Sequence, residues 1–192
     1  VAFLLREKTF WAEAGHEVAF GQYVYQVEGT PEAPACGVEL VRSLHNIGVR
    51  GENFEVLFSV LNGGLVSYKY AGREMIEAIP KPNFWRAPTD NDCGSLMQMR
   101  YAQWKIASMY ASHKDYRKGM YGPANAPETT VHENSVEVAF TYILPTTPAS
   151  ECRLAYEVTG DGRVKTTLTY DPVKELGDMP EFGVLFKFNA DY

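Results

Sequence analysis

The residue types best suited to chemistry lie together in one stretch, residues 83–94. Two carboxylates, Asp90 and Asp92, flank Asn91, and Arg86 lies just upstream. Glycoside hydrolysis needs two carboxyl groups about 5 to 10 Å apart, a distance that two aspartates in one turn can meet. Such aspartates more often cap the backbone or pair with an arginine, whose forked guanidinium fixes a loop. We therefore favour a structural brace over a catalytic pair. The brace consists of Arg86, Asp90, Asn91 and Asp92.

Metal and nucleophile chemistry have less support in the sequence. Calcium uses Asp-x-Asp spacing, but this turn offers too few oxygen ligands for a good site. The four histidines are isolated from one another and from the three cysteines, which leaves neither a catalytic triad nor zinc-ligand spacing. No glycine-rich phosphate loop is present, because Asn62-Gly63-Gly64 is typical of a hairpin turn. We therefore predict no catalytic residue and no metal site in this chain.

Four aromatic residues accompany the acidic turn: Phe84, Trp85, Tyr101 and Trp104. Such rings can pack on the apolar face of a sugar. They can equally fill the core of a sandwich, and from the sequence alone we favour the core.

Strand patterns dominate the rest of the chain. Polar and apolar side chains alternate in the segments 54–60, 65–70, 136–142, 152–158 and 164–170, and a last candidate strand holds Val184, Phe186 and Phe188. Asn62-Gly63-Gly64 and Asp161-Gly162 supply tight turns between neighbouring segments. One short helix is expected after Gly94, with Met97, Tyr101, Trp104 and Ser108 on one face. The sequence therefore predicts an all-β fold, an antiparallel β-sandwich with one short helix.

Composition excludes several classes of partner. The 192 residues are 45% hydrophobic and 22% charged, as in an ordinary globular protein. A formal net charge of −6 without a basic cluster argues against a nucleic-acid surface. No apolar run reaches the roughly 18 to 20 residues of a membrane helix. We expect neither a nucleic acid nor a membrane as partner. The unpatterned cysteines slightly favour the cytoplasm, and the compartment stays open.

Two changes in composition suggest how the chain is organised. Residues 28–37 are rich in proline and glycine and are interpreted as a linker. Residues 1–27 would then hold about two strands, too few for a stable unit. The stretch from Lys114 to Pro127 is expected to be a surface excursion. Because the chain begins and ends in strand-like patterns, we expect a fragment whose unpaired strand edges make it self-associate.

Residues 84–94, Phe-Trp-Arg-Ala-Pro-Thr-Asp-Asn-Asp-Cys-Gly, resemble the signature of the small-chain domain of glycoside hydrolase family 2 β-galactosidases. Three other stretches agree, in the order of the family. Residues 10–19 resemble the end of the immunoglobulin-like domain that precedes the small-chain domain. Residues 54–75 resemble the first hairpin of the small-chain domain, and residues 179–184 resemble a later strand. The resemblance implies that 1–27 are C-terminal strands of an immunoglobulin-like sandwich and that 38–192 are the N-terminal part of a supersandwich related to galactose mutarotases.

The resemblance also implies a function. It points to a retaining enzyme that hydrolyses terminal β-D-galactosides, whose (β/α)₈ barrel carries two catalytic glutamates. No residue of this chain matches their motifs. This domain would contact the barrel and the other domains and help to wall the galactoside site. The brace would fix the base of a substrate-proximal flap. That flap corresponds to Gly94, Ser95, Leu96, Met97, Gln98, Met99 and Arg100.

Further implications concern cofactors and assembly. Mg and Na ions belong to the complete enzyme in this family and no cofactor is expected in this fragment, since the flap carries no acidic residue for a metal contact. A homo-oligomeric parent enzyme is expected. A glycine at the start of the flap suits a hinge, because glycine adopts φ angles that other residues avoid.

Two other readings stay open. A stand-alone carbohydrate-binding or interaction module could use the same fold, because fold alone does not fix function. Mutarotase-like catalysis would need an acid and a base converging in a concave site, and no His and Glu pair in the sequence suggests one. The preferred galactoside, the oligomeric state and the metal dependence stay open as well.

Overall fold

A computed structural model describes residues 1–25, 37–114 and 127–190. The chain divides into two compact units, Val1–Glu32 and Ala33–Tyr192. The predicted linker, apart from Gly37, lies outside the described residues, and so does the interior of the predicted surface excursion. The assignment of residues 1–27 to an immunoglobulin-like domain stays a prediction.

The first unit is a hairpin of two short antiparallel strands, β1 (Ala2–Leu4) and β2 (Glu17–Phe20). Two hydrogen bonds close the loop between these strands: the Leu5 N–H donates to the His16 carbonyl at 2.8 Å, and the Gly15 N–H donates to the Leu5 carbonyl at 2.8 Å. The apolar side chains of both strands are exposed. A lone hairpin buries too little apolar area to be stable.

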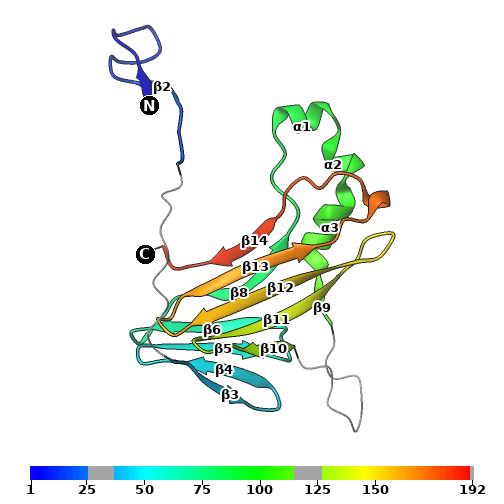
Figure 1. Cartoon of the computed structure of the whole chain (residues 1–192). Helices are drawn as coiled ribbons and strands as arrows, with labels where there is room; N and C mark the ends of the chain where they lie inside the picture. The colour runs from blue at the N-terminus through cyan, green and yellow to red at the C-terminus, as the bar shows by residue number, and fades with distance from the viewer. Residues whose placement is uncertain (26–36, 115–126, 191–192) are drawn as a thin grey trace. The chain divides into compact units, whose positions relative to one another are not determined.

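The second unit contains two larger antiparallel sheets (Figure 1). The strands of the first sheet are, in spatial order, β3 (Glu39–Arg42), β4 (Asn46–Arg50), β5 (Phe54–Ser59), β6 (Gly64–Tyr70) and β7 (Arg73–Glu74). Those of the second are β10 (Glu128–Val131), β11 (Ser135–Leu144), β12 (Ser150–Thr159) and β13 (Val164–Tyr170), with β9 (Ser112–His113) also paired to β11. The sequence-based prediction of an all-β antiparallel sandwich is confirmed.

Side chains from both sheets meet in one core. Phe58 of β5 lies with its ring centroid 6.3 Å from that of Phe140 on β11 and 5.5 Å from that of Tyr156 on β12. All three side chains are fully buried. Two hydrogen bonds also join the sheets: the Tyr142 hydroxyl donates to the Gly63 carbonyl at 2.6 Å, and the Tyr68 hydroxyl donates to that of Gly162 at 2.7 Å. The alternation in the sequence therefore reflects one buried face on each strand.

A further two-stranded ladder forms a sheet of its own beside β6. It pairs β8 (Ala78–Asn83) with β14 (Gly183–Lys187), so that Asn83 lies opposite Gly183. Pro80 and Pro82 lie within β8, where each removes a backbone donor from the ladder. The apolar side chains predicted for the last strand are only partly covered, because Phe186 and Phe188 remain exposed.

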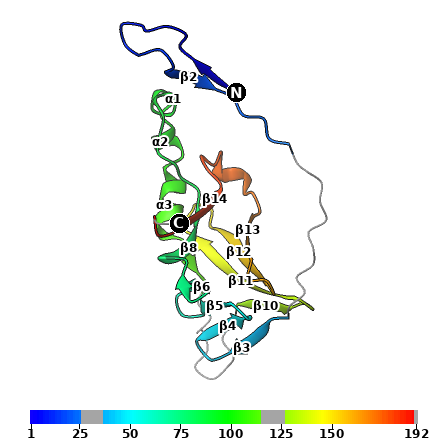
Figure 2. The same cartoon turned by 90° about the vertical axis from the view of Figure 1, so that its left-hand side faces the viewer.

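Three short helices follow β8, where the sequence predicted one. They are α1 (Asp90–Gly94), α2 (Met97–Arg100) and α3 (Ala102–Tyr110), and Figure 2 shows them following one another along one side of the unit. The predicted helix is interrupted at Tyr101, where φ and ψ of −119° and 21° depart from helical geometry, and Leu96, with left-handed angles of 58° and 34°, separates α1 from α2. Trp104 and Ala107 are the buried residues of α3.

Candidate functional site

The candidate site begins where β8 ends. Phe84 is fully buried, with its ring 5.7 Å from Trp104 and 6.2 Å from Phe182 between centroids. Its N–H donates to the Ser108 hydroxyl of α3 at 2.8 Å, and that hydroxyl donates to the Trp104 carbonyl at 2.9 Å. The interpretation of Phe84 and Trp104 as core residues is confirmed. The chain is thus anchored in the core just before it reaches the polar residues.

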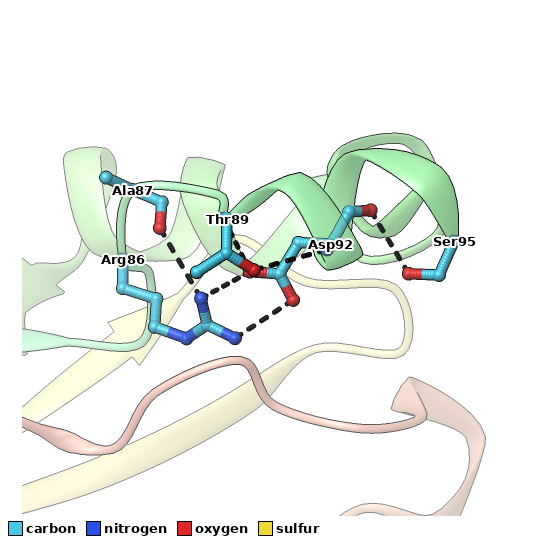
Figure 3. Close-up of polar contacts among 5 residues, drawn as sticks. All are labelled: Arg86, Ala87, Thr89, Asp92 and Ser95. Atoms are coloured by element: carbon cyan, nitrogen blue, oxygen red, sulfur yellow. Dashed lines mark hydrogen bonds and ion pairs between the residues drawn. The ribbon is translucent and has the colours of Figure 1, made fainter. Parts of the chain in front are cut away.

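Arg86 and Asp92 form the central contact of the site (Figure 3). The guanidinium binds the carboxylate with both terminal nitrogens, Nη1 on Oδ2 and Nη2 on Oδ1, the latter at 3.0 Å. Nη1 also donates to the Ala87 carbonyl at 3.4 Å. The Asp92 side chain is only 15% exposed, compared with 40% for Arg86. A two-pronged pair of this kind fixes direction as well as distance, because guanidinium and carboxylate are both planar.

Electrostatics keep this carboxylate ionised. The hydrogen bonds from Arg86, and then those from the backbone and side chain of Thr89, hold the pKa of Asp92 well below its usual range. The same contact with Asp92 raises the pKa of Arg86, and the charge of Glu181 adds to that effect. A general acid must carry a proton near neutral pH, and a general base must have a free oxygen for one. Asp92 meets neither condition, so the arrangement serves to hold the chain in place.

Thr89 completes the contact and was not singled out from the sequence. Its N–H and its hydroxyl both donate to Asp92 Oδ2, at 2.8 and 2.9 Å, while the Asp92 N–H donates back to Thr89 Oγ1 at 3.3 Å. This is a capping box at the start of α1. The spacing Thr-x-x-Asp was visible in the sequence and is the signal that could have found it. Ser95 Oγ adds a bond to the Asp92 carbonyl at 3.1 Å.

The other two predicted brace residues lie beside this contact. Asp90 and Asn91 are exposed in the first turn of α1, and within the described part of the chain no side-chain hydrogen bond is seen for either. Asp90 still has a favourable place, because carboxylates stabilise the positive end of a helix. The structure therefore brings Arg86 and Asp92 together with Thr89 and leaves Asp90 and Asn91 facing solvent.

Residues 94–100, predicted as a flap, comprise the last residue of α1, the connecting Ser95 and Leu96, and the whole of α2. Gly94 ends α1 with φ outside the left-handed region, so it does not use the conformational freedom on which the hinge argument relied. The left-handed residue is Leu96, whose side chain is 53% exposed. Met97 is buried, whereas Met99 is 73% exposed. A bulky left-handed residue is uncommon and marks a strained position.

The far end of this segment is tied to a distant part of the chain. The Tyr101 hydroxyl donates to Asp178 Oδ2 at 3.1 Å, and Gln103 Nε2 donates to the Leu176 carbonyl at 2.9 Å. The Arg100 guanidinium lies over the Tyr101 ring at 5.2 Å. Asp178 and Leu176 belong to the segment between β13 and β14, which includes the 3₁₀ helix η1 (Lys174–Leu176). Residues 94–100 are therefore held at both ends.

The described residues offer no cluster of three or more histidine, cysteine, aspartate or glutamate side chains that could hold a metal ion. Within the same ranges, none of the helices has the length and apolar character needed to cross a membrane. Cys93 is exposed and Cys152 is buried, and both are free thiols.

Comparison with known proteins identifies the family. The family model described as the β-galactosidase small chain matches residues 50–192. A β-galactosidase of Halalkalibacterium halodurans is 39% identical over 193 residues, covering 98% of this chain and 18% of that protein. A β-galactosidase of Streptococcus thermophilus is 36% identical over 192 residues, covering all of this chain and 18% of that protein.

A shorter relative is the β-galactosidase small subunit of Latilactobacillus sakei, 30% identical over 149 residues that cover 73% of this chain and 47% of that subunit. The chain spans about a fifth of the length of the larger relatives. The family model covers most of the chain, and it includes both the Arg86–Asp92 contact and the segment that this contact supports. The chain therefore belongs to the β-galactosidase small-chain family.

Proposed function

We propose that this chain is a non-catalytic part of a β-galactosidase and that residues 94–100 form part of the wall of its galactoside site. The family match and the β-galactosidases among its relatives support the reaction. Since the chain covers about a fifth of those relatives, the catalytic carboxylates are expected elsewhere in the enzyme. The chain by itself is then expected to be inactive. The complete enzyme is expected to belong to glycoside hydrolase family 2 and to hydrolyse terminal β-D-galactosides with retention.

One observation supports the role proposed for residues 94–100: hydrogen bonds hold both ends of this segment. Arg86, Asp92 and Thr89 hold the N-terminal end. Tyr101 and Gln103 hold the C-terminal end. Between these points the side chains of Leu96 and Met99 are exposed. A segment that is fixed at both ends and at the buried Met97, and that leaves Leu96 and Met99 exposed, is suited to present apolar side chains to a ligand while its position stays defined.

The experiment is a kinetic comparison in the complete enzyme. Asp92→Asn keeps the shape of the side chain and removes its charge. It therefore weakens the contact with Arg86 that supports residues 94–100 and leaves no cavity at position 92. We expect KM for a nitrophenyl galactoside to rise severalfold with a smaller change in kcat, because substrate positioning is lost while the catalytic carboxylates are untouched.

Asp161→Asn is the matched control. Asp161 accepts from Thr159 Oγ1 at 2.5 Å and from Arg163 Nε at 2.5 Å, so it repeats the Thr–Asp–Arg chemistry in the turn between β12 and β13. KM should be unchanged in this control. Equal kinetics for wild type and Asp92→Asn, or an equal rise in the control, would overturn the assignment of residues 94–100.

The reaction itself has a separate test. Proton NMR of the first product should show β-galactose before mutarotation if hydrolysis proceeds with retention. Hydrolysis of the same substrate by the 192-residue chain alone would contradict the non-catalytic role.

A further inference from the structure

A pocket of about 390 Å³ opens between α3, the end of β13 and the segment that follows β13. Its walls include Trp104, Tyr170, Gly177, Asp178, Met179 and Phe182. The volume lies in the range of pockets that bind small molecules. Of these residues, Asp178 also holds the end of the segment discussed above, through Tyr101, but the role proposed above does not account for the pocket itself.

Three aromatic rings make up much of the wall. Trp104 and Tyr170 meet edge to face, with centroids 5.8 Å apart and planes at 87°. Phe182 packs against Phe84 on one side and is 52% exposed on the other. Ring faces of this kind attract flat, weakly polar surfaces, among them the C–H face of a pyranose.

Two polar groups accompany the rings. Asp178 accepts one hydrogen bond from Tyr101, and an ionised carboxylate has room for several more. The indole Nε1 of Trp104 is buried and has no acceptor among the residues described. Nearly all buried N–H groups in proteins have a partner, so this one indicates a missing acceptor. Neighbouring atoms cover the nitrogen in this structure.

We propose that this pocket binds a neutral pyranose ring, with its C–H face on Phe182 and Tyr170 and a hydroxyl on the Asp178 carboxylate. A purely apolar ligand would leave the Asp178 carboxylate in the pocket wall without a hydrogen-bond donor from the ligand. An anionic sugar would be repelled, because Asp178 is the charged residue among those that line the pocket. The proposal adds a second carbohydrate site to the chain and does not depend on the role of residues 94–100.

The test uses the indole N–H signals of the full chain in nitrogen–proton NMR. The chain has three tryptophans, Trp11, Trp85 and Trp104, and Trp104→Phe identifies the signal of interest. Methyl β-D-galactopyranoside and methyl β-D-glucopyranoside are titrated separately. We expect at least one of them to shift the Trp104 signal until it saturates and to leave Trp11 unchanged.

Variants decide whether the pocket is responsible. Phe182→Ala should raise the dissociation constant about three- to tenfold, the contribution expected of one aromatic contact. Asp178→Asn should also weaken binding. Phe188→Ala, an exposed aromatic outside the pocket, should leave the constant unchanged.

Three results would overturn the proposal: no saturable shift of Trp104 with either glycoside, equal binding by Phe182→Ala and Phe188→Ala, or tighter binding of cyclohexanol than of either glycoside. Because the readout is a binding signal at Trp104, its failure leaves the kinetic test of Asp92 unaffected.

Discussion

Two buried tyrosine hydroxyls provide a matched test of what joins the two sheets. Tyr142 on β11 is 5% exposed and donates to the Gly63 carbonyl, in the turn between β5 and β6, at 2.6 Å. Tyr156 on the neighbouring strand β12 is fully buried, and its hydroxyl has no hydrogen-bond partner in the described residues. The two substitutions Tyr142→Phe and Tyr156→Phe remove the same atom from two different environments.

The expected magnitudes follow from that difference. Tyr142→Phe removes a hydrogen bond and leaves a buried carbonyl at Gly63 without this donor, which costs about 1 to 3 kcal/mol. Tyr156→Phe removes a hydroxyl that loses its hydrogen bonds to water on folding and gains none from the described residues in return. Its effect should lie between zero and a stabilisation of about 1 kcal/mol. For a chain of this length each kcal/mol corresponds to about 2 to 4 °C in Tm.

Urea unfolding of both variants, followed by tryptophan fluorescence, measures the difference. Trp104 is 1% exposed and therefore reports the unfolding of the second unit. Tyr142→Phe should unfold at a lower urea concentration than wild type, and Tyr156→Phe at the same or a higher one. Equal losses in the two variants would refute the reasoning, because they would mean that both hydroxyls are equally well bonded or that ring packing alone decides stability.

Three further predictions concern acid stability, a turn glycine and association. Because the folded-state pKa of Asp92 is lowered, its contribution to stability is present above the unfolded pKa of about 3.9 and is lost as pH falls through the folded pKa. The difference in unfolding free energy between wild type and Asp92→Asn should therefore be constant from pH 7 to about pH 5 and shrink below about pH 4; a constant difference down to pH 2 would contradict it. Gly63→Ala should cost about 1 to 3 kcal/mol, because φ is +71° and the new Cβ would lie 2.0 Å from His113 Cγ. Gly94→Ala, whose Cβ would meet nothing within 4 Å, is its control in the same thermal melt. The isolated chain should self-associate through exposed apolar side chains, and sedimentation showing a monomer at all concentrations would disprove that.

The strands were predictable because each buries one face. Alternation identified β5, β6, β11, β12 and β13, and the turns at Asn62-Gly63-Gly64 and Asp161-Gly162 fixed the pairing of β5 with β6 and of β12 with β13. The strand β8 was not predicted, since Pro80 and Pro82 argue against a strand and are tolerated only because this ladder has two members. The alternation of polar and apolar residues also does not show whether another element covers the apolar face of a strand. Phe186 and Phe188 are examples, because both are exposed.

The candidate site was predictable only where it is local in the chain. Arg86 and Asp92 are six residues apart, and a short turn has few ways to arrange an arginine and a carboxylate. The hydrogen bond from Tyr101 to Asp178 joins residues that are 77 positions apart, and the sequence around either residue does not indicate its partner. The predicted helical face, which holds Met97 and Tyr101, is interrupted at Tyr101, and local sequence pattern does not show that the hydroxyl of this residue bonds to Asp178.

The ladder between β8 and β14 has a consequence for how the site comes into being on the ribosome. Asn83, which leads into Phe84 and Arg86, pairs with Gly183, about a hundred residues later in the chain. At roughly 5 to 20 residues per second, β14 is synthesised about 5 to 20 s after β8. Throughout that interval the strand that carries the site has no β14 with which to pair. The pairing of Asn83, just before the site, is thus among the last contacts of the unit that the nascent chain can complete.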